Sequence, residues 1–245
     1  MVSRCENSTY VTPELMIVMP VFNEEASLEK VIHEWFAAVD QEVENFVLLA
    51  IDDGSADSTP RILQRLAEEL GPRLEVVSRP NKGHGQTCLE GYRLATERGI
   101  PFILQIDSDG QSDPRYFGEF WEQRTRFEVI YGKRLRSDGL RRILASFVLR
   151  ASLQWITKVN CVDANVPYRL MNTKACACGI SQVPEETFLA NVVLAVILRK
   201  NPALSHGSIP IGFPPRQGGE PSVPMGKFAE KAVELFKQMK QAGIC

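Results

Sequence analysis

Short apolar runs alternate with amphipathic segments through the first half of the chain. The runs at 16–21, 46–51, 74–77 and 102–106 contain Val, Ile and Leu and predict strands, the first of them buried. The segments that follow them repeat apolar residues with helical spacing. The first of these carries Leu28, Val31, Ile32, Trp35, Phe36 and Val39. This alternation predicts an α/β fold with a mostly parallel central sheet flanked by helices.

The second half of the chain is less regular. Its pattern predicts a helix near 185–200, a strand near 208–213 and a final amphipathic helix within 225–245. No internal repeat or low-complexity linker divides the chain, and 245 residues suffice for a sizeable core. We therefore expect one globular domain over 13–245, preceded by an N-terminal extension at 1–12.

The charge of the chain is nearly balanced overall but uneven along the sequence. The formal net charge is −2 and the isoelectric point about 6.0, which argues against a nucleic-acid partner. Residues 133–158, however, hold seven basic side chains and one acid, Asp138. We expect this segment to meet an anion. The overlapping stretch at 140–159 forms a basic amphipathic pattern that fits either a membrane interface or ordinary core packing.

Cysteine usage and hydropathy indicate the compartment. The six cysteines are scattered without metal-ligand spacing, which is typical of reduced thiols in a reducing compartment. The start of the sequence lacks the apolar segment of a signal peptide, and the longest apolar run, 189–198, is too short to span a bilayer. We expect a cytoplasmic protein that does not cross a membrane by itself.

Polar clusters follow each of the four predicted strands. They contain Asn23 with Glu24, Asp52 with Asp53, the turn at 81–85, and Asp107 with Asp109. Because working residues of parallel sheets lie at the carboxyl ends of the strands, these clusters predict one site. Two carboxylates that alternate after an apolar strand suit a hard divalent cation such as Mg²⁺ or Mn²⁺.

These clusters, in this order, resemble the signatures of family 2 glycosyltransferases with the GT-A fold. Later segments at 132–134, 141–142, 163–169 and 216–220 resemble the branch that includes dolichyl-phosphate mannose synthase and its bacterial polyprenyl-phosphate relatives. Each motif alone is weak evidence, but their order is specific. The resemblance implies a nucleotide-sugar-binding half at 13–113 and an acceptor half at 114–224.

The resemblance also implies roles for residues of the donor half. Pro20, Asn23 and Glu24 would border the base and ribose of a nucleoside-diphosphate sugar, UDP- or GDP-linked. Asp52 and Asp53 would accept hydrogen bonds from the same nucleoside. Lys82 and Arg216 would lie near the donor phosphates. The ion that bridges the diphosphate would be held by Asp107, Asp109 and Gln111.

For the acceptor half, the resemblance implies that Arg134 and Arg142 hold an acceptor phosphate, since guanidinium groups match phosphate oxygens bidentately. Together with Asp109 and Asp163 they form the catalytic set. The implied activity is inverting, metal-dependent transfer of a sugar to a polyprenyl phosphate at the cytoplasmic face of the membrane, with peripheral membrane contact. One departure is 221–223, Pro-Ser-Val, where close relatives often carry Ser-Lys.

Three other functions remain open from the sequence. A transferase acting on a saccharide hydroxyl would need a base, for which Glu185 and Glu186 are candidates. A haloacid-dehalogenase-type phosphatase would use Asp107 as nucleophile, although Gln111 departs from that pattern. A non-catalytic nucleotide-binding subunit is the third. The sequence identifies neither the sugar nor the nucleotide, and it leaves the oligomeric state open.

Overall fold

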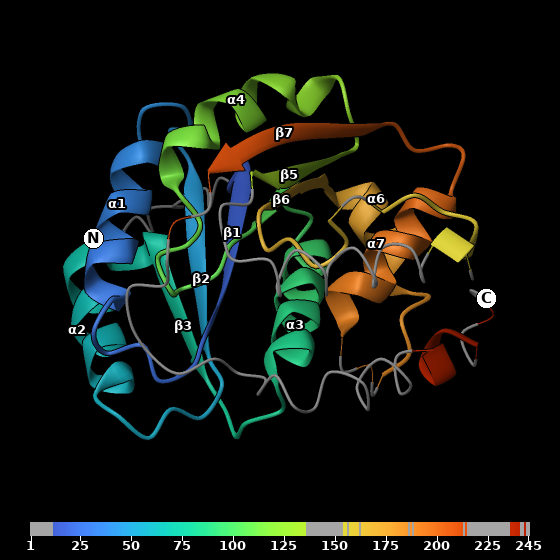
Figure 1. Cartoon of the computed structure of the whole chain (residues 1–245). Coiled ribbons are helices and arrows are strands. Elements are labelled where there is room, and N and C mark those ends of the chain that lie inside the picture. Colours follow the sequence, from blue (N-terminus) through green and yellow to red (C-terminus); the bar gives the residue numbers. More distant parts are fainter. Residues whose placement is uncertain are drawn as a thin grey trace, which may run out of the picture.

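The fold is a layered α/β domain built on one sheet (Figure 1). The computed structural model describes residues 12–135, 154–155, 157–161, 163–185, 187, 189–212, 214, 236–240 and 243. The strands are β1 Leu15–Val21, β2 Phe46–Asp52, β3 Leu74–Ser78, β4 Phe102–Gln105, β5 Val129–Leu135, β6 Arg169–Asn172 and β7 His206–Gly212. The predicted domain boundary at residue 13 stays a prediction.

Helices connect the strands and cover both faces of the sheet. The α-helices are α1 Leu28–Val39, α2 Thr59–Leu70, α3 His84–Glu97, α4 Phe117–Glu122, α6 Thr173–Ile180 and α7 Ala190–Lys200. Short 3₁₀ helices lie at η1 Gly71–Arg73, η2 Pro114–Tyr116 and η3 Gln123–Thr125. Helix α1 packs with α2 and α4, whereas α3 packs with α6 and α7 on the opposite side (Figure 1).

The sheet order is β3-β2-β1-β4-β6-β5-β7. Among the described strands only β6 is antiparallel to its neighbours, β4 and β5. The expected mostly parallel sheet is therefore confirmed. The chain moves outward from β1 to β3 and then returns to place β4 on the other side of β1. The pair β1 and β4 is thus a topological switch point, where open α/β sheets leave a crevice for a ligand.

The predicted elements of the first half are confirmed. Strands β1 and β2 are buried at every position, as expected for central parallel strands covered on both faces. Helix α1 buries all six apolar residues of its predicted stripe. These three elements therefore bury the faces that their sequence patterns assigned to the core.

The second half was predicted less well. Strands β5 and β6 and helix α6 were not predicted, and α7 begins at Ala190 rather than near residue 185. Strand β5 breaks the apolar pattern because its carboxyl end carries Lys133 and Arg134. Of the expected C-terminal helix, 236–240 is helical and includes the buried Met239.

Most of the basic amphipathic pattern at 140–159 lies outside the described residues. Within the described part, Trp155 is 77% exposed. No helix in the described ranges is long and apolar enough to span a bilayer.

Candidate active site

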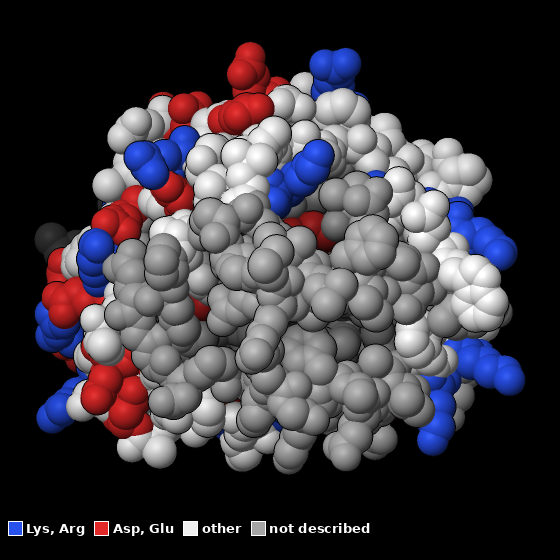
Figure 2. Space-filling model, viewed as in Figure 1, with Lys and Arg blue, Asp and Glu red and all other residues white. Residues whose placement is uncertain are grey.

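The carboxyl ends of β1, β2, β3 and β4 lie at one edge of the sheet because these strands are parallel. The carboxyl ends of β5 and β7 and the start of the antiparallel β6 reach the same edge. Figure 2 shows acidic atoms recessed in the middle of the viewed face, near Lys or Arg side chains. The four predicted polar clusters are thus brought to one edge, as the sequence indicated.

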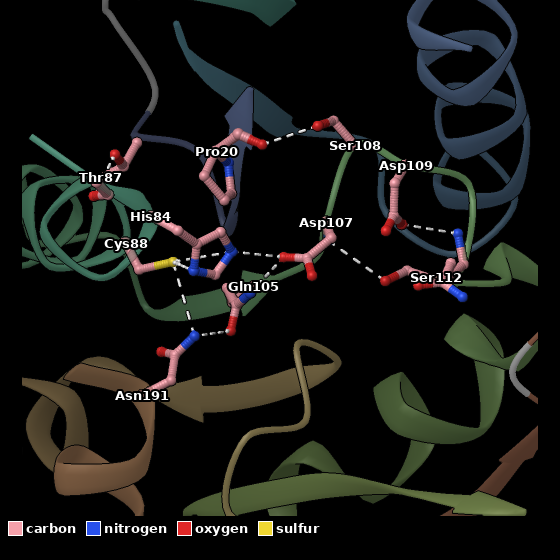
Figure 3. Close-up of polar contacts among 12 residues, drawn as sticks. Pro20, His84, Thr87, Cys88, Gln105, Asp107, Ser108, Asp109, Ser112 and Asn191 are labelled. Atoms are coloured by element: carbon pink, nitrogen blue, oxygen red, sulfur yellow. Dashed lines mark hydrogen bonds and ion pairs between the residues drawn. The ribbon is translucent and has the colours of Figure 1, made fainter. Parts of the chain in front are cut away.

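At the switch point, the loops after β1 and β4 are joined directly. The Ser108 hydroxyl donates to the carbonyl oxygen of Pro20 at 2.9 Å (Figure 3). Ser27, at the start of α1, donates to the carbonyl oxygen of Ser108 and to the Glu24 carboxylate. Glu24 is buried, with 4% of its surface exposed. The motif that contains Pro20 and Glu24 therefore fixes the spacing between the first and fourth loops.

Asn23 connects the first loop to the second. Its φ of 52° lies in the left-handed region, which asparagine tolerates better than most residues. The backbone N–H of Asn23 donates to Ser55, and the Asn23 side-chain oxygen accepts from the N–H of Ala56. In this structure Asn23 shapes the site edge through protein contacts; its expected contact with a nucleoside stays a prediction.

Asp53 organises the turn that precedes α3. Its two carboxylate oxygens accept the backbone N–H groups of Lys82 at 2.8 Å and Gly83 at 2.9 Å. The guanidinium of Arg79 donates to the same carboxylate at 2.6 Å. Gly54 allows the close approach, because a Cβ there would lie 2.9 Å from the backbone nitrogen of Asn81. Asp53 therefore fixes the backbone of the turn at Lys82.

Asp52 is also buried, and its carboxylate accepts the N–H of Ser55 at 3.1 Å. This bond fixes the turn after β2 beside Asn23. Both aspartates of the predicted pair therefore shape the loops, and their expected contacts with a nucleoside remain untested.

Asp107 lies at the centre of the edge and points toward His84 at the start of α3 (Figure 3). Its Oδ1 atom is 3.0 Å from Nε2 of His84 and accepts from the side-chain nitrogen of Gln105 at 3.2 Å. Desolvation acts to lower the pKa of His84, but its contacts with Cys88 and the Asp107 carboxylate outweigh this and hold that pKa well above its usual value. Within the described residues the Oδ2 atom of Asp107 has no hydrogen-bond partner.

Asp109 follows on the same loop, with 7% of its surface exposed. One carboxylate oxygen accepts the N–H of Gln111 at 3.0 Å. The Gln111 side-chain nitrogen donates to the carbonyl oxygen of Pro214 at 2.8 Å, just after β7. Gln111 therefore ties the acidic loop to the segment that leads toward Arg216.

The donor set of this loop suits a hard divalent cation. Asp107 and Asp109 offer carboxylate oxygens, the ligands that Mg²⁺ and Mn²⁺ prefer. The described residues contain no group of three or more His, Cys, Asp or Glu side chains that could enclose a metal. Two carboxylates leave positions for phosphate oxygens and water, so the residues present fit a cation that arrives with a diphosphate.

Arg134 and Asp163 meet at the same edge. Arg134, near the end of β5, makes a bidentate pair with Asp163, which precedes β6; both N···O distances are 2.6 Å. The two side chains are 18% and 10% exposed. Sequence reasoning assigned both residues to the catalytic set, and the fold brings them into contact over 29 positions of sequence.

Several predicted residues lie outside the described part of the chain. They are Arg142, Arg216 and Glu186. Glu185 is described and exposed. Sequence reasoning missed the buried polar residues Tyr92, Gln105 and Asn191, which contact one another beside Asp107. A signal existed, since Gln105 and Asn191 are polar residues within apolar runs.

Comparisons with known proteins place these features in a family. The chain matches Glycosyl transferase family 2 over residues 16–147. It is 31% identical over 149 residues to the undecaprenyl-phosphate 4-deoxy-4-formamido-L-arabinose transferase of Aeromonas hydrophila, covering 60% of this chain and 45% of that protein. It is 29% identical over 140 residues to the dodecaprenyl-phosphate galacturonate synthase of Rhizobium johnstonii, covering 56% and 41%. The chain spans about half the length of the curated relatives it matches.

The fold is similar to that of glucosyl-3-phosphoglycerate synthase from Mycobacterium tuberculosis, solved with Mn²⁺, uridine-diphosphate-glucose and phosphoglyceric acid. The TM-score is 0.68 at 18% identity, and the likeness covers 95% of this chain and 81% of that one. At this identity the likeness concerns the fold alone. Because the family match covers more than half of the chain and the fold agrees with it, this chain belongs to glycosyl transferase family 2 and has the GT-A fold that its motifs predicted.

Proposed function

We propose that the chain transfers a sugar from a nucleoside-diphosphate sugar to a polyprenyl phosphate. The observation that carries the proposal is the meeting of two sets of residues at one sheet edge. Asp107 and Asp109 lie at the switch point, and the Arg134–Asp163 pair lies at the end of β5. The curated relatives that act on undecaprenyl or dodecaprenyl phosphate support this acceptor class.

The donor would lie across the ends of β1, β2 and β4. Asp53 and Arg79 hold the turn at 81–85, so that Lys82 can face the donor phosphates without reorganising. Asp52, Asn23 and Pro20 line the neighbouring loops, where the nucleoside would bind. Mg²⁺ or Mn²⁺ held by Asp107 and Asp109, with Gln111 nearby, would neutralise the charge that develops on the departing diphosphate.

The acceptor would approach from the side of β5. Arg134 presents a guanidinium group already oriented by Asp163, and Arg142 would add a second. An acceptor phosphate is an anion at neutral pH and can attack the anomeric carbon without a general base. Transfer would be a single displacement that inverts the anomeric centre and releases the nucleoside diphosphate. A lipid acceptor implies peripheral contact with the cytoplasmic face of a membrane.

Thermal shift measurements test the donor class. UDP, GDP, CDP and ADP are each added with and without Mn²⁺ or Mg²⁺. A ligand at 100 times its dissociation constant contributes about 2.7 kcal/mol, which corresponds to roughly 5–10 °C for a chain of this size. We expect one nucleotide to stabilise the protein only with metal, and Asp109→Ala to lose that effect. Equal stabilisation with and without metal would remove the assignment of Asp107 and Asp109.

A direct assay then tests the acceptor. The stabilising nucleotide is supplied as its sugar conjugates together with a short polyprenyl phosphate, and the glycolipid is measured by mass spectrometry. Transfer to the lipid phosphate is the expected outcome. Transfer to a soluble saccharide in its place would contradict the proposed acceptor class.

Transfer to a saccharide hydroxyl remains the second candidate because of one contact. The side chain of Gln86, in the first turn of α3, donates to the carbonyl oxygen of Thr187 at 3.2 Å. This bond brings the segment that contains Glu185 close to the turn at 81–85, where a general base would be useful. If Glu185→Gln or Glu186→Gln abolishes transfer while binding of the nucleotide persists, the hydroxyl acceptor is favoured.

A further inference from the structure

A cluster of buried polar side chains lies behind Asp107, within the apolar core. Gln105 and Tyr92 are fully buried, and Asn191 is 3% exposed. Asn191 is the polar member of the otherwise apolar buried stretch of α7. A buried polar group lowers stability unless it is hydrogen-bonded. The hydrogen-bond partners of these three side chains therefore indicate which group they position.

Gln105 and Asn191 belong to a closed ring of contacts that also includes Cys88, His84 and one oxygen of Asp107 (Figure 3). The Gln105 side-chain nitrogen donates to Asp107 Oδ1 at 3.2 Å, and the Gln105 side-chain oxygen accepts from Asn191 at 3.1 Å. Asn191 also donates to the Cys88 sulfur at 3.7 Å. Cys88 contacts His84, which returns to Asp107 Oδ1 at 3.0 Å.

The ring fixes the orientation of the Gln105 amide. Its oxygen faces Asn191 and the hydroxyl of Tyr92, which lies 3.2 Å away, so its N–H donors must face Asp107. Asn191 is anchored in turn, because Arg169 of β6 donates to its backbone carbonyl oxygen at 3.1 Å. The Oδ1 atom of Asp107 is thereby held from two sides, and Oδ2 stays available on the same carboxylate.

We infer that Gln105 and Asn191 are positioning residues that hold the Asp107 carboxylate in the orientation needed to bind a divalent cation. The inference rests on the proposed function, since it assigns a supporting shell to the cation site proposed there. Partners of this kind orient metal ligands, and their loss typically lowers metal affinity about 10- to 100-fold. A purely structural role predicts instead a loss of stability without a change in metal affinity.

Two substitutions remove the ring contacts while nearly preserving side-chain volume. Gln105→Met deletes the donor to Asp107 and leaves the 3.0 Å bond between Tyr92 and Asn191. Asn191→Leu deletes one of the two donors that orient the Gln105 amide; the other is the Tyr92 hydroxyl. The matched control is Asn172→Ala. Asn172 caps α6 by accepting the N–H of Ala175 and pairs with Phe102 at the opposite edge of the sheet.

The experiment titrates Mn²⁺ into the full chain by calorimetry, with the nucleoside diphosphate that stabilises the wild type present throughout. We expect Gln105→Met and Asn191→Leu each to raise the dissociation constant of Mn²⁺ about tenfold. The double variant should resemble the single variants, because both substitutions act on Asp107 through the same bond from Gln105. Asn172→Ala should lower the melting temperature and leave the dissociation constant unchanged.

The outcomes separate the two proposals. If the wild type does not bind Mn²⁺, the proposed function loses its metal site. If the wild type binds Mn²⁺ and both ring variants bind it equally well, the positioning role is overturned and the ring only stabilises the core. Should Asn191→Leu fail to fold, Gln105→Met alone decides the matter by the same measurement.

Discussion

At the scale of single residues, the site is built from side chains whose partners are other parts of the protein. Asp53 binds the turn before α3, Asp107 is held by His84 and Gln105, and Arg134 is held by Asp163. Such pre-oriented groups need little rearrangement when a ligand arrives. The geometry of the pairs therefore matters as much as their charge.

Arg134→Lys tests this geometry. Lysine keeps the charge but cannot make the bidentate contact with Asp163 or with a phosphate. We expect a loss of about tenfold or more in kcat/KM for the proposed polyprenyl phosphate acceptor, equivalent to at least 1.4 kcal/mol. Arg115→Lys is the control, because Arg115 makes a similar pair with Asp113 but is 85% exposed. Equal activity of the two variants would mean that Arg134 has no role in transfer.

At the scale of elements, the site depends on how α3 and its preceding turn sit against the sheet. Arg79 anchors the turn: it lies 2.6 Å from Asp53 and 2.7 Å from Glu90, and its side chain is 8% exposed. Gly91 of α3 faces Val18 of β1 with no space for a larger residue. The first contact fixes the turn, and the second sets the distance between helix and sheet.

Replacing Arg79 should be costly. Arg79→Gln leaves the buried carboxylate of Asp53 and the partly exposed carboxylate of Glu90 without their cation. We expect a loss on the order of 3 kcal/mol in the free energy of unfolding. Arg98→Gln breaks an exposed pair with Glu75 and should cost at most about 1 kcal/mol. Urea unfolding measures both. Similar losses in the two variants would show that burial of the Arg79 pair is unimportant.

Gly91→Ala tests the packing of α3. A Cβ at this position would lie 2.3 Å from a methyl carbon of Val18, so helix or strand must shift. We expect a loss of roughly 1–3 kcal/mol, the usual range for overpacking. Gly118→Ala in α4 is the control, since its nearest neighbour is the flexible end of Glu42 at 3.0 Å. A stable Gly91→Ala variant would contradict the tight contact.

At the scale of the whole molecule, burial of thiol and phenol groups lowers the free energy of unfolding in alkaline solution. Burial raises the pKa of the Cys176 thiol to about 12, and it raises the pKa values of Tyr92 and Tyr168 well above their usual value. The unfolded thiol ionises near pH 9.0. Between these values the folded state binds more protons, so stability is complete below pH 9 and falls as pH rises toward 12.

The melting temperature should therefore fall in alkaline solution. Through Cys176 alone, each pH unit above 9 lowers the free energy of unfolding by about 1.4 kcal/mol, which lowers the melting temperature by roughly 3–5 °C. We expect Cys176→Ala to flatten this decline between pH 9 and 11. Cys178→Ala, which removes an exposed thiol from the same helix, should leave the slope as in the wild type. Scanning calorimetry across this range provides the measurement, and identical slopes for both variants would contradict the role of Cys176.

The first half of the fold and the family could both be predicted from the amino-acid sequence. Hydrophobic periodicity is a local property, so β1 to β4 and α1 to α3 followed from it. Parallel strands then bring their carboxyl ends together, which is why the clusters at Asn23, Asp53 and Asp107 could be assigned to one edge before their contacts were known. The motif order likewise sufficed to indicate glycosyl transferase family 2.

The partners of the polar residues, in contrast, became known from the folded structure. The pairing of Arg134 with Asp163 joins positions 29 residues apart, and that of Gln105 with Asn191 joins positions 86 apart. Strands β5 and β6 were not predicted because charged residues interrupt the apolar pattern at the ends of these strands that reach the candidate active site. The physical reason is the same in each case: a local pattern records which face is buried, whereas hydrogen-bond partners are set by the folded chain.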